Sequence, residues 1–229
     1  MTRLLDLIHV ENPYQGFDKA AYPTDLQGWG STDPIFSALF DKLRPRRVAE
    51  IGTWKGASAL HMAQLANEYG IQDCEIVCID TWLGSVEHWF FRERPDYFPS
   101  LKLKHGYPTL YMTFLANVIE AGAVDRIVPF PVASTAAARF LAAHGILFDL
   151  IYIDAAHQYD EVQLDVGLFW PLVRPGGVMF GDDYVDSFPG VIRAVDEFAA
   201  AIGGNLQVNR KSSNKWMIQR EGPPVCPLS

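Results

Sequence analysis

Residues 148–184 read FDLIYIDAAHQYDEVQLDVGLFWPLVRPGGVMFGDDY, and this stretch decides the fold. It holds two nearly continuous apolar runs, 148–154 and 177–182, on either side of a helical pattern over 159–173. Apolar runs without alternation are typical of strands that are buried on both faces of a parallel sheet. The stretch therefore predicts two neighbouring parallel strands that are joined by a right-handed helical crossover.

The same alternation of strands and helices continues toward both ends of the chain. The other predicted strands are 47–51, 75–80 and 127–132, and the other predicted helices are 33–43, 57–69, 135–143 and 190–202. Near the end, 206–210 and 215–219 have the pattern of a hairpin, which adds antiparallel strands at one edge. The sequence thus predicts an α/β fold with a doubly wound, mostly parallel, seven-stranded Rossmann-like sheet and a C-terminal antiparallel hairpin.

We interpret residues 1–229 as a single domain, because this length is within the range of one large α/β domain. Residues 1–30 are expected to be irregular, and 1–44 to form an N-terminal cap segment. Residues 81–111 form an insertion with eight aromatic side chains, which we interpret as a lid over the active site. The alternative is that this insertion adds a hydrophobic layer or an oligomer contact.

The composition excludes several classes of function. The chain has 27 acidic and 19 basic residues and a formal net charge of −8, which disfavours nucleic acid as a partner. No uninterrupted apolar run is long enough to span a bilayer, and the first residues do not resemble a signal peptide. Three cysteines are too few for a disulfide framework. We therefore expect a cytoplasmic protein that binds neither nucleic acid nor membranes and that can form a homo-oligomer.

A glycine turn follows the predicted strand 47–51 and reads Glu50-Ile-Gly52-Thr-Trp54-Lys-Gly56. A dinucleotide fingerprint needs a glycine where Trp54 stands, so pyrophosphate binding is disfavoured. An acidic residue before the turn suits a ligand with an ammonium group and no phosphate. S-adenosylmethionine has that chemistry, and we predict it as the cofactor.

Further cofactor contacts are expected at the ends of the next strands. Asp80 ends a strand and can accept hydrogen bonds from the ribose hydroxyls, although a turn or cap role is the alternative. Ser134 can contact the adenine, but we favour its role as the N-cap of the next helix. The predicted cofactor site comprises Glu50, Gly52, Thr53, Gly56, Asp80, Thr81, Ser134 and Asp154.

Three carboxylates and a histidine follow the two strands of the central stretch. Asp154 and His157 come after the first strand, and Asp182 and Asp183 come after the second. Carboxylates this close repel one another unless a cation intervenes, and oxygen ligands suit Mg²⁺ or another divalent cation. Beside such an ion His157 can act as a general base. The alternative is that some of these aspartates only cap helices.

These motifs resemble class I S-adenosylmethionine-dependent methyltransferases. D-x-x-H-x-Y, R-P-G-G-x-x-x-x-D-D-Y and P-G-V-x-x-A-V-D-E-F resemble the metal-dependent macrocin and mycinamicin-type sugar O-methyltransferases and the cephalosporin hydroxylase-like proteins. The resemblance implies that Mg²⁺ is ligated by Asp154, Asp182 and Asp183, and that His157 is the base. It implies that the cofactor is held by Glu50, Gly52 and Asp80.

The expected activity is therefore Mg²⁺-assisted transfer of a methyl group to a hydroxyl of a sugar or another small hydroxylated molecule. The expected partner is a small-molecule acceptor, such as a glycoside or a vicinal diol. Three alternatives stay open: a catechol or acyl-CoA-type O-methyltransferase, a nicotinamide-dependent oxidoreductase, and a non-catalytic nucleoside-binding protein.

Overall fold

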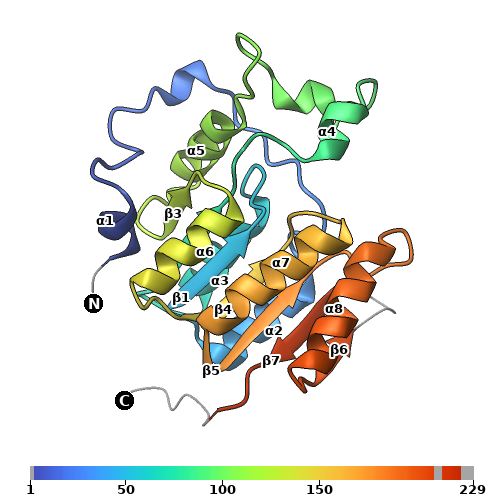
Figure 1. The fold of residues 1–229 in the computed structure, drawn as a ribbon. Coiled ribbons are helices and arrows are strands. Elements are labelled where there is room, and N and C mark those ends of the chain that lie inside the picture. Colours follow the sequence, from blue (N-terminus) through green and yellow to red (C-terminus); the bar gives the residue numbers. More distant parts are fainter. Residues whose placement is uncertain (1–2, 209–212, 223–229) are drawn as a thin grey trace.

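A seven-stranded sheet forms the centre of the molecule, in the order β3-β2-β1-β4-β5-β7-β6 (Figure 1). The computed structural model describes residues 3–208 and 213–222. The strands are β1 (Arg47–Ile51), β2 (Glu75–Ile79), β3 (Ile127–Phe130), β4 (Phe148–Ile153), β5 (Val173–Gly181), β6 (Leu206–Val208) and β7 (Trp216–Gln219). Pairing is parallel from β3 to β5 and antiparallel at β7 and β6. The predicted fold class is confirmed.

The two strands of the central stretch lie side by side, as predicted. Every residue of β4 is buried, and β4 pairs with β1 on one side and β5 on the other. The register places Ile153 opposite Gly181 at the carboxyl ends of the two strands. Asp154 and Asp182 therefore follow neighbouring strand ends, where ligands bind in doubly wound sheets.

Helices cover both faces of the sheet. One face packs against α1 (Leu4–Ile8), α6 (Ser134–Ala143), α7 (Tyr159–Phe169) and α8 (Pro189–Ala201). The other face packs against α2 (Pro34–Leu43), α3 (Ala57–Glu68) and α5 (Leu110–Glu120). Figure 1 shows α6, α7 and α8 in front of the sheet, with α2 and α3 behind it. Each face buries its own apolar core.

Several predicted boundaries were wrong. The stretch 1–30 was expected to be irregular, but it contains α1 and the 3-10 helix η1 (Lys19–Ala21), and α5 was not predicted. The helix expected over 159–173 ends at Phe169, and a 3-10 turn with Pro171 follows (η3, Trp170–Leu172), because proline disfavours a continuing α-helix. β5 then begins four residues before the predicted 177. Residues 209 and 210 of the predicted hairpin lie outside the described residues.

The insertion at 81–111 contains α4 (Val86–Phe90) and the 3-10 helix η2 (Phe98–Leu101). It is anchored to the domain, because Leu101 is fully buried and Ser100 Oγ accepts a hydrogen bond from the buried Lys55. Among the described residues, no helix is long and apolar enough to cross a membrane. Cys74 and Cys78 are buried free thiols, whereas Cys226 lies outside the described residues.

Candidate active site

The glycine turn after β1 lies against the end of β4. Gly52 has φ +85°, and a Cβ built there would lie 2.0 Å from the Asp154 carbonyl oxygen. Gly56 has φ +89°, and its Cβ would lie 2.9 Å from the Phe114 ring. Only glycine combines this backbone conformation with so close an approach. The predicted turn is therefore set by the contact between β1 and β4, and it leaves the first turn of α3 facing the ligand side.

Asp80 fixes the shape of this turn. Its Oδ2 accepts a hydrogen bond from the Trp54 amide at 2.8 Å, and its Oδ1 accepts one from the Trp82 amide at 2.7 Å. The Trp82 indole in turn donates to the Trp54 carbonyl at 2.7 Å. Burial raises the pKa of Asp80, while the backbone hydrogen bonds oppose that rise. Asp80 also lines the cavity, where a ligand can reach it. Its contact with a ribose stays a prediction.

Glu50 lies beneath the turn, outside the set of described residues that line the cavity. Its side chain is fully buried and accepts hydrogen bonds from Ser58 Oγ and the Cys78 thiol. Burial raises the pKa of Glu50 to about 8, opposed by the hydrogen bond from Ser58. The carboxyl group is therefore mostly neutral at pH 7. Glu50 lies behind the loop and does not line the cavity. Its predicted contact with the cofactor stays a prediction.

This burial predicts a pH-dependent stability difference for Glu50→Gln. In the wild type the folded-state pKa of about 8 exceeds the reference value of 4.5, so the unfolded chain releases a proton that the folded protein keeps. Wild-type stability should therefore fall as the pH rises through this window, by at most about 1.4 kcal/mol per pH unit. Glutamine removes this dependence. The free energy of unfolding of the variant, relative to that of the wild type, should therefore rise between pH 5 and pH 8.

Urea unfolding at several pH values measures this difference. The matched control is Glu93→Gln, which makes the same change at an exposed position of the insertion and should follow the wild type at every pH. A Glu50→Gln profile parallel to the wild type across this window would show that Glu50 is ionised in the folded protein.

A cavity of about 890 Å³ opens at the carboxyl edge of β1, β2, β4 and β5. That volume lies in the upper part of the range for small-molecule sites. Of the predicted residues, the cavity is lined by Gly52, Thr53, Asp80, Thr81, Ser134, Asp154, His157, Asp182 and Asp183. Of these candidates, Glu50 and Gly56 are outside the lining. The structure thus brings both predicted groups, the cofactor set and the acidic set, to one cavity.

The prediction that Ser134 is an N-cap was wrong. The N-cap of α6 is Ala133, which makes no side-chain cap, and Ser134 is the first helical residue. Its hydroxyl hydrogen-bonds Asp165 of α7, whose pKa burial raises to about 6 while that hydrogen bond lowers it. Ser134 therefore links two helices at the cavity wall, and its predicted adenine contact remains a prediction.

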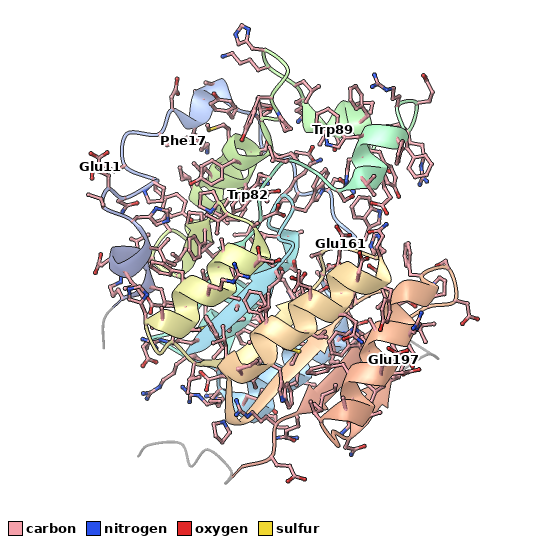
Figure 2. All side chains as sticks on the ribbon, in the orientation of Figure 1. Glu11, Phe17, Trp82, Trp89, Glu161 and Glu197 are labelled. Atoms are coloured by element: carbon pink, nitrogen blue, oxygen red, sulfur yellow. The ribbon has the colours of Figure 1, made fainter. Side chains whose placement is uncertain are left out.

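The insertion supplies an aromatic wall to the cavity. The His88 ring lies 4.2 Å from the Trp54 ring and 5.3 Å from the Tyr97 ring, and Trp29 lies 6.1 Å from Tyr97. Burial lowers the pKa of His88 to about 4, so this ring is neutral at pH 7. Figure 2 shows Trp89 on the insertion and the cavity-lining Glu161 at the end of α7 that faces it.

Trp29 was missed by the sequence analysis. The stretch around it was expected to be irregular, and it carries no periodic pattern that marks a site. In the structure Gly28, Trp29 and Ser31 all line the cavity, so the N-terminal segment forms part of its wall.

His157 forms a hydrogen-bonded pair with Asp183. Its Nε2 lies 2.9 Å from Asp183 Oδ2, its Nδ1 lies 3.6 Å from Glu87 Oε1 of α4, and its ring stacks on Phe188 at 4.1 Å. Burial alone would lower the pKa of His157, but the hydrogen bond to Asp183 and the charges of Asp183 and Glu87 outweigh it. The net pKa is therefore raised.

The acidic residues are close enough to repel one another, because burial and the charges of Asp182 and Asp183 raise the pKa of Asp154. Each of them nevertheless has its own partner from the chain. Asp183 turns away from Asp182 in a left-handed conformation with φ +62°, and it pairs with His157. Asp182 is paired with the buried ammonium of Lys215. Tyr152 donates a hydrogen bond to Asp154 at 2.8 Å. Among the described residues, no three His, Cys, Asp or Glu side chains are grouped so that they could hold a metal ion. The predicted Mg²⁺ site does not fit this arrangement.

A family model described as a methyltransferase domain matches residues 49–184. A comparison with curated proteins gives no match. Solved structures with the same fold include CalS11, a calicheamicin methyltransferase also described as a TDP-rhamnose 3′-O-methyltransferase. CalS11 aligns with a TM-score of 0.62 at 19% identity, covering 85% of this chain and 80% of its own.

Two further structures hold the cofactor or its product. The O-methyltransferase TomG from Streptomyces achromogenes, in complex with SAM, aligns with a TM-score of 0.58 at 18% identity over 86% of this chain and 83% of its own. An O-methyltransferase from Bacillus cereus, in complex with SAH, aligns with a TM-score of 0.58 at 17% identity, covering 89% of this chain and 86% of its own. The chain therefore belongs to the methyltransferase domain family, and its fold is that of the class I S-adenosylmethionine-dependent methyltransferases.

Proposed function

We propose that the protein is an S-adenosylmethionine-dependent O-methyltransferase that acts on a hydroxyl of a sugar or another small hydroxylated molecule. The observation that carries this proposal is the His157–Asp183 pair in the same cavity as the glycine turn and Asp80. A base that is oriented by a carboxylate suits a hydroxyl acceptor, which must lose a proton as it attacks. The description of CalS11 as a TDP-rhamnose methyltransferase also supports a sugar acceptor.

The residues of the glycine turn fit the cofactor. Gly52 and Thr53 line the cavity beside Asp80, whose carboxylate is held in place by two backbone amides. The bound cofactor supplies a methyl group on a sulfonium, which is already a good leaving group. The protein therefore has to orient the acceptor and take its proton.

His157 performs the proton transfer in this proposal. With the Nε2 hydrogen donated to Asp183, the lone pair is on Nδ1, which has no hydrogen-bond partner within the described part of the chain. Asp183 holds the ring and stabilises its charged form after it takes the proton. Glu87 faces the same nitrogen from α4, so the position of the insertion controls access to the base.

The aromatic wall binds the acceptor and excludes water. Trp29, Trp54 and Tyr97 all line the cavity, and sugar faces stack on aromatic rings of this kind. Closing the site strengthens the electrostatic interactions within it. This is the role that we propose for the lid at 81–111.

Two measurements test the proposed function. Calorimetry should show binding of S-adenosylmethionine and no binding of NADH, because Trp54 stands where a dinucleotide site needs glycine. Mass spectrometry of glycosides, diols and phenols incubated with methyl-labelled cofactor should show label on a sugar or diol hydroxyl. Label only on phenols would favour the catechol or acyl-CoA-type alternative, and binding of NADH alone would contradict the proposal.

A further inference from the structure

Lys215 is a buried cation directly below the acidic edge of the cavity. Its side chain is 2% exposed, and its ammonium forms an ion pair with Asp182. The Lys215 Nζ also lies 3.0 Å from the Tyr152 hydroxyl and faces the Phe36 ring at 5.7 Å. A buried ammonium is costly unless it is paired, so these contacts indicate a built ionic site.

Lys215 is also connected to a second carboxylate, that of Asp154, through a hydrogen-bonded tyrosine. Tyr152 Oη accepts from the Lys215 ammonium and donates to Asp154 Oδ2 at 2.8 Å. One ammonium is therefore connected to Asp182 directly and to Asp154 through one hydroxyl. The third aspartate, Asp183, has His157 as its partner. Each carboxylate that was predicted to bind a metal already has a partner from the chain.

The N-terminal segment lies against this ion pair. A Cβ built on Gly30 would lie 3.0 Å from both Asp182 Oδ2 and Lys215 Nζ, so the backbone of this segment covers the pair. Mg²⁺ requires octahedral coordination and usually retains several waters. Both oxygens of Asp182 already have partners, because Oδ2 pairs with the Lys215 ammonium and Oδ1 accepts a hydrogen bond from the Asp183 amide.

We propose that Lys215 is the resident cation of this acidic edge, pairing with Asp182 directly and reaching Asp154 through the Tyr152 hydroxyl, in the place that a divalent metal ion would otherwise take. Lys215 is a positioning residue, because it lies outside the cavity lining and acts through Asp182 and Tyr152. The placement of the ion pair does not depend on the proposed function. The consequence for turnover does rest on it.

Metal binding to the wild-type protein is the first test, and it needs no acceptor. Titration with Mn²⁺, followed by the loss of the free-ion signal in electron paramagnetic resonance, should show no site with a Kd below about 1 mM. A stoichiometric Mn²⁺ site that is tighter than this and is lost in Asp182→Asn would overturn the proposal.

Removing the ammonium should create a metal site. In Lys215→Ala the carboxylates lose their cation and the side chain leaves space, so Mn²⁺ should bind at least about tenfold more tightly than to the wild type. Adding Asp182→Asn to this variant should remove the new site. The matched control is Lys55→Ala, which deletes another ammonium that is 2% exposed and paired with Asp25 at 2.8 Å.

The control variant should not gain Mn²⁺ affinity, because Lys55 is not paired with the cavity aspartates. Equal gains in both lysine variants would contradict the specific role of Lys215, as would no gain in a folded Lys215→Ala protein. If Lys215→Ala does not fold, the wild-type titration still decides the proposal.

Turnover supplies a second readout once a labelled acceptor is found. Wild-type activity should be unchanged in EDTA, and Lys215→Arg should retain more of it than Lys215→Met, because arginine keeps the charge. Activity that is lost in EDTA and restored by Mg²⁺ would overturn the role of Lys215 while leaving the methyltransferase proposal intact. Absence of a methylated product from the whole panel would instead count against the proposed function.

Discussion

Gly52→Ala is expected to weaken binding of S-adenosylmethionine by about a hundredfold or more and to destabilise the fold by about 3 kcal/mol. The new Cβ would lie 2.0 Å from the Asp154 carbonyl oxygen, at a position with φ +85°. The clash is with backbone at the end of β4, which cannot move without disturbing the strand pairing. The turn must therefore shift away from Asp80 and deform the predicted cofactor site.

Calorimetry with the cofactor and urea unfolding measure the two parts of this effect. The matched control is Gly145→Ala, at a glycine with φ +64° that has no atom within 4 Å of its built Cβ. This control carries the same kind of backbone strain without the clash, so it should bind the cofactor like the wild type. A Gly52→Ala protein with wild-type affinity would contradict the proposed location of the cofactor.

The arrangement of the sheet could be predicted because its strands are recognisable from their own sequence. β4 and β5 are uninterrupted apolar runs that are followed by acidic residues, and their pairing follows from the crossover between them. By contrast, α5 was not predicted, since most of its residues are buried and its sequence, LYMTFLANVIE, has no clear polar face. A helix buried on most sides lacks the period that identifies amphipathic helices.

The cavity could be predicted only in part. Asp80, Asp154 and His157 follow strand ends, so topology alone brings them to one edge of the sheet. Lys215 could not be recognised in the same way, because a single lysine at the start of a hairpin strand has no motif. Its position depends on the antiparallel pairing of β5 with β7, in which Gly181 lies opposite Trp216. That register places Lys215 beside Asp182. A metal site predicted from the carboxylates alone therefore did not take this lysine into account.

His157→Ala is expected to lower kcat by about 10²- to 10⁴-fold while leaving the affinity for S-adenosylmethionine within about twofold of the wild type. The imidazole pairs with Asp183 and stacks on Phe188, while the glycine turn that we assign to the cofactor makes its own contacts through Asp80. Loss of the base should therefore affect the chemical step and spare cofactor binding. Calorimetry and initial rates on the acceptor found by the labelled panel separate the two quantities.

A second variant tests whether Asp183 orients the base. Asp183→Asn keeps the size of the side chain but removes its charge, so the pKa of His157 should fall and the acidic limb of the kcat/KM profile should move to lower pH. The control for loss of a histidine is His144→Ala, at an exposed residue whose ring hydrogen-bonds the Phe140 carbonyl and packs against the Phe140 ring. Unchanged turnover in His157→Ala would assign the proton transfer to another group. A cofactor affinity that falls in parallel with kcat would mean that His157 shapes the cofactor site instead, because a base that acts only on the acceptor cannot change binding of the methyl donor.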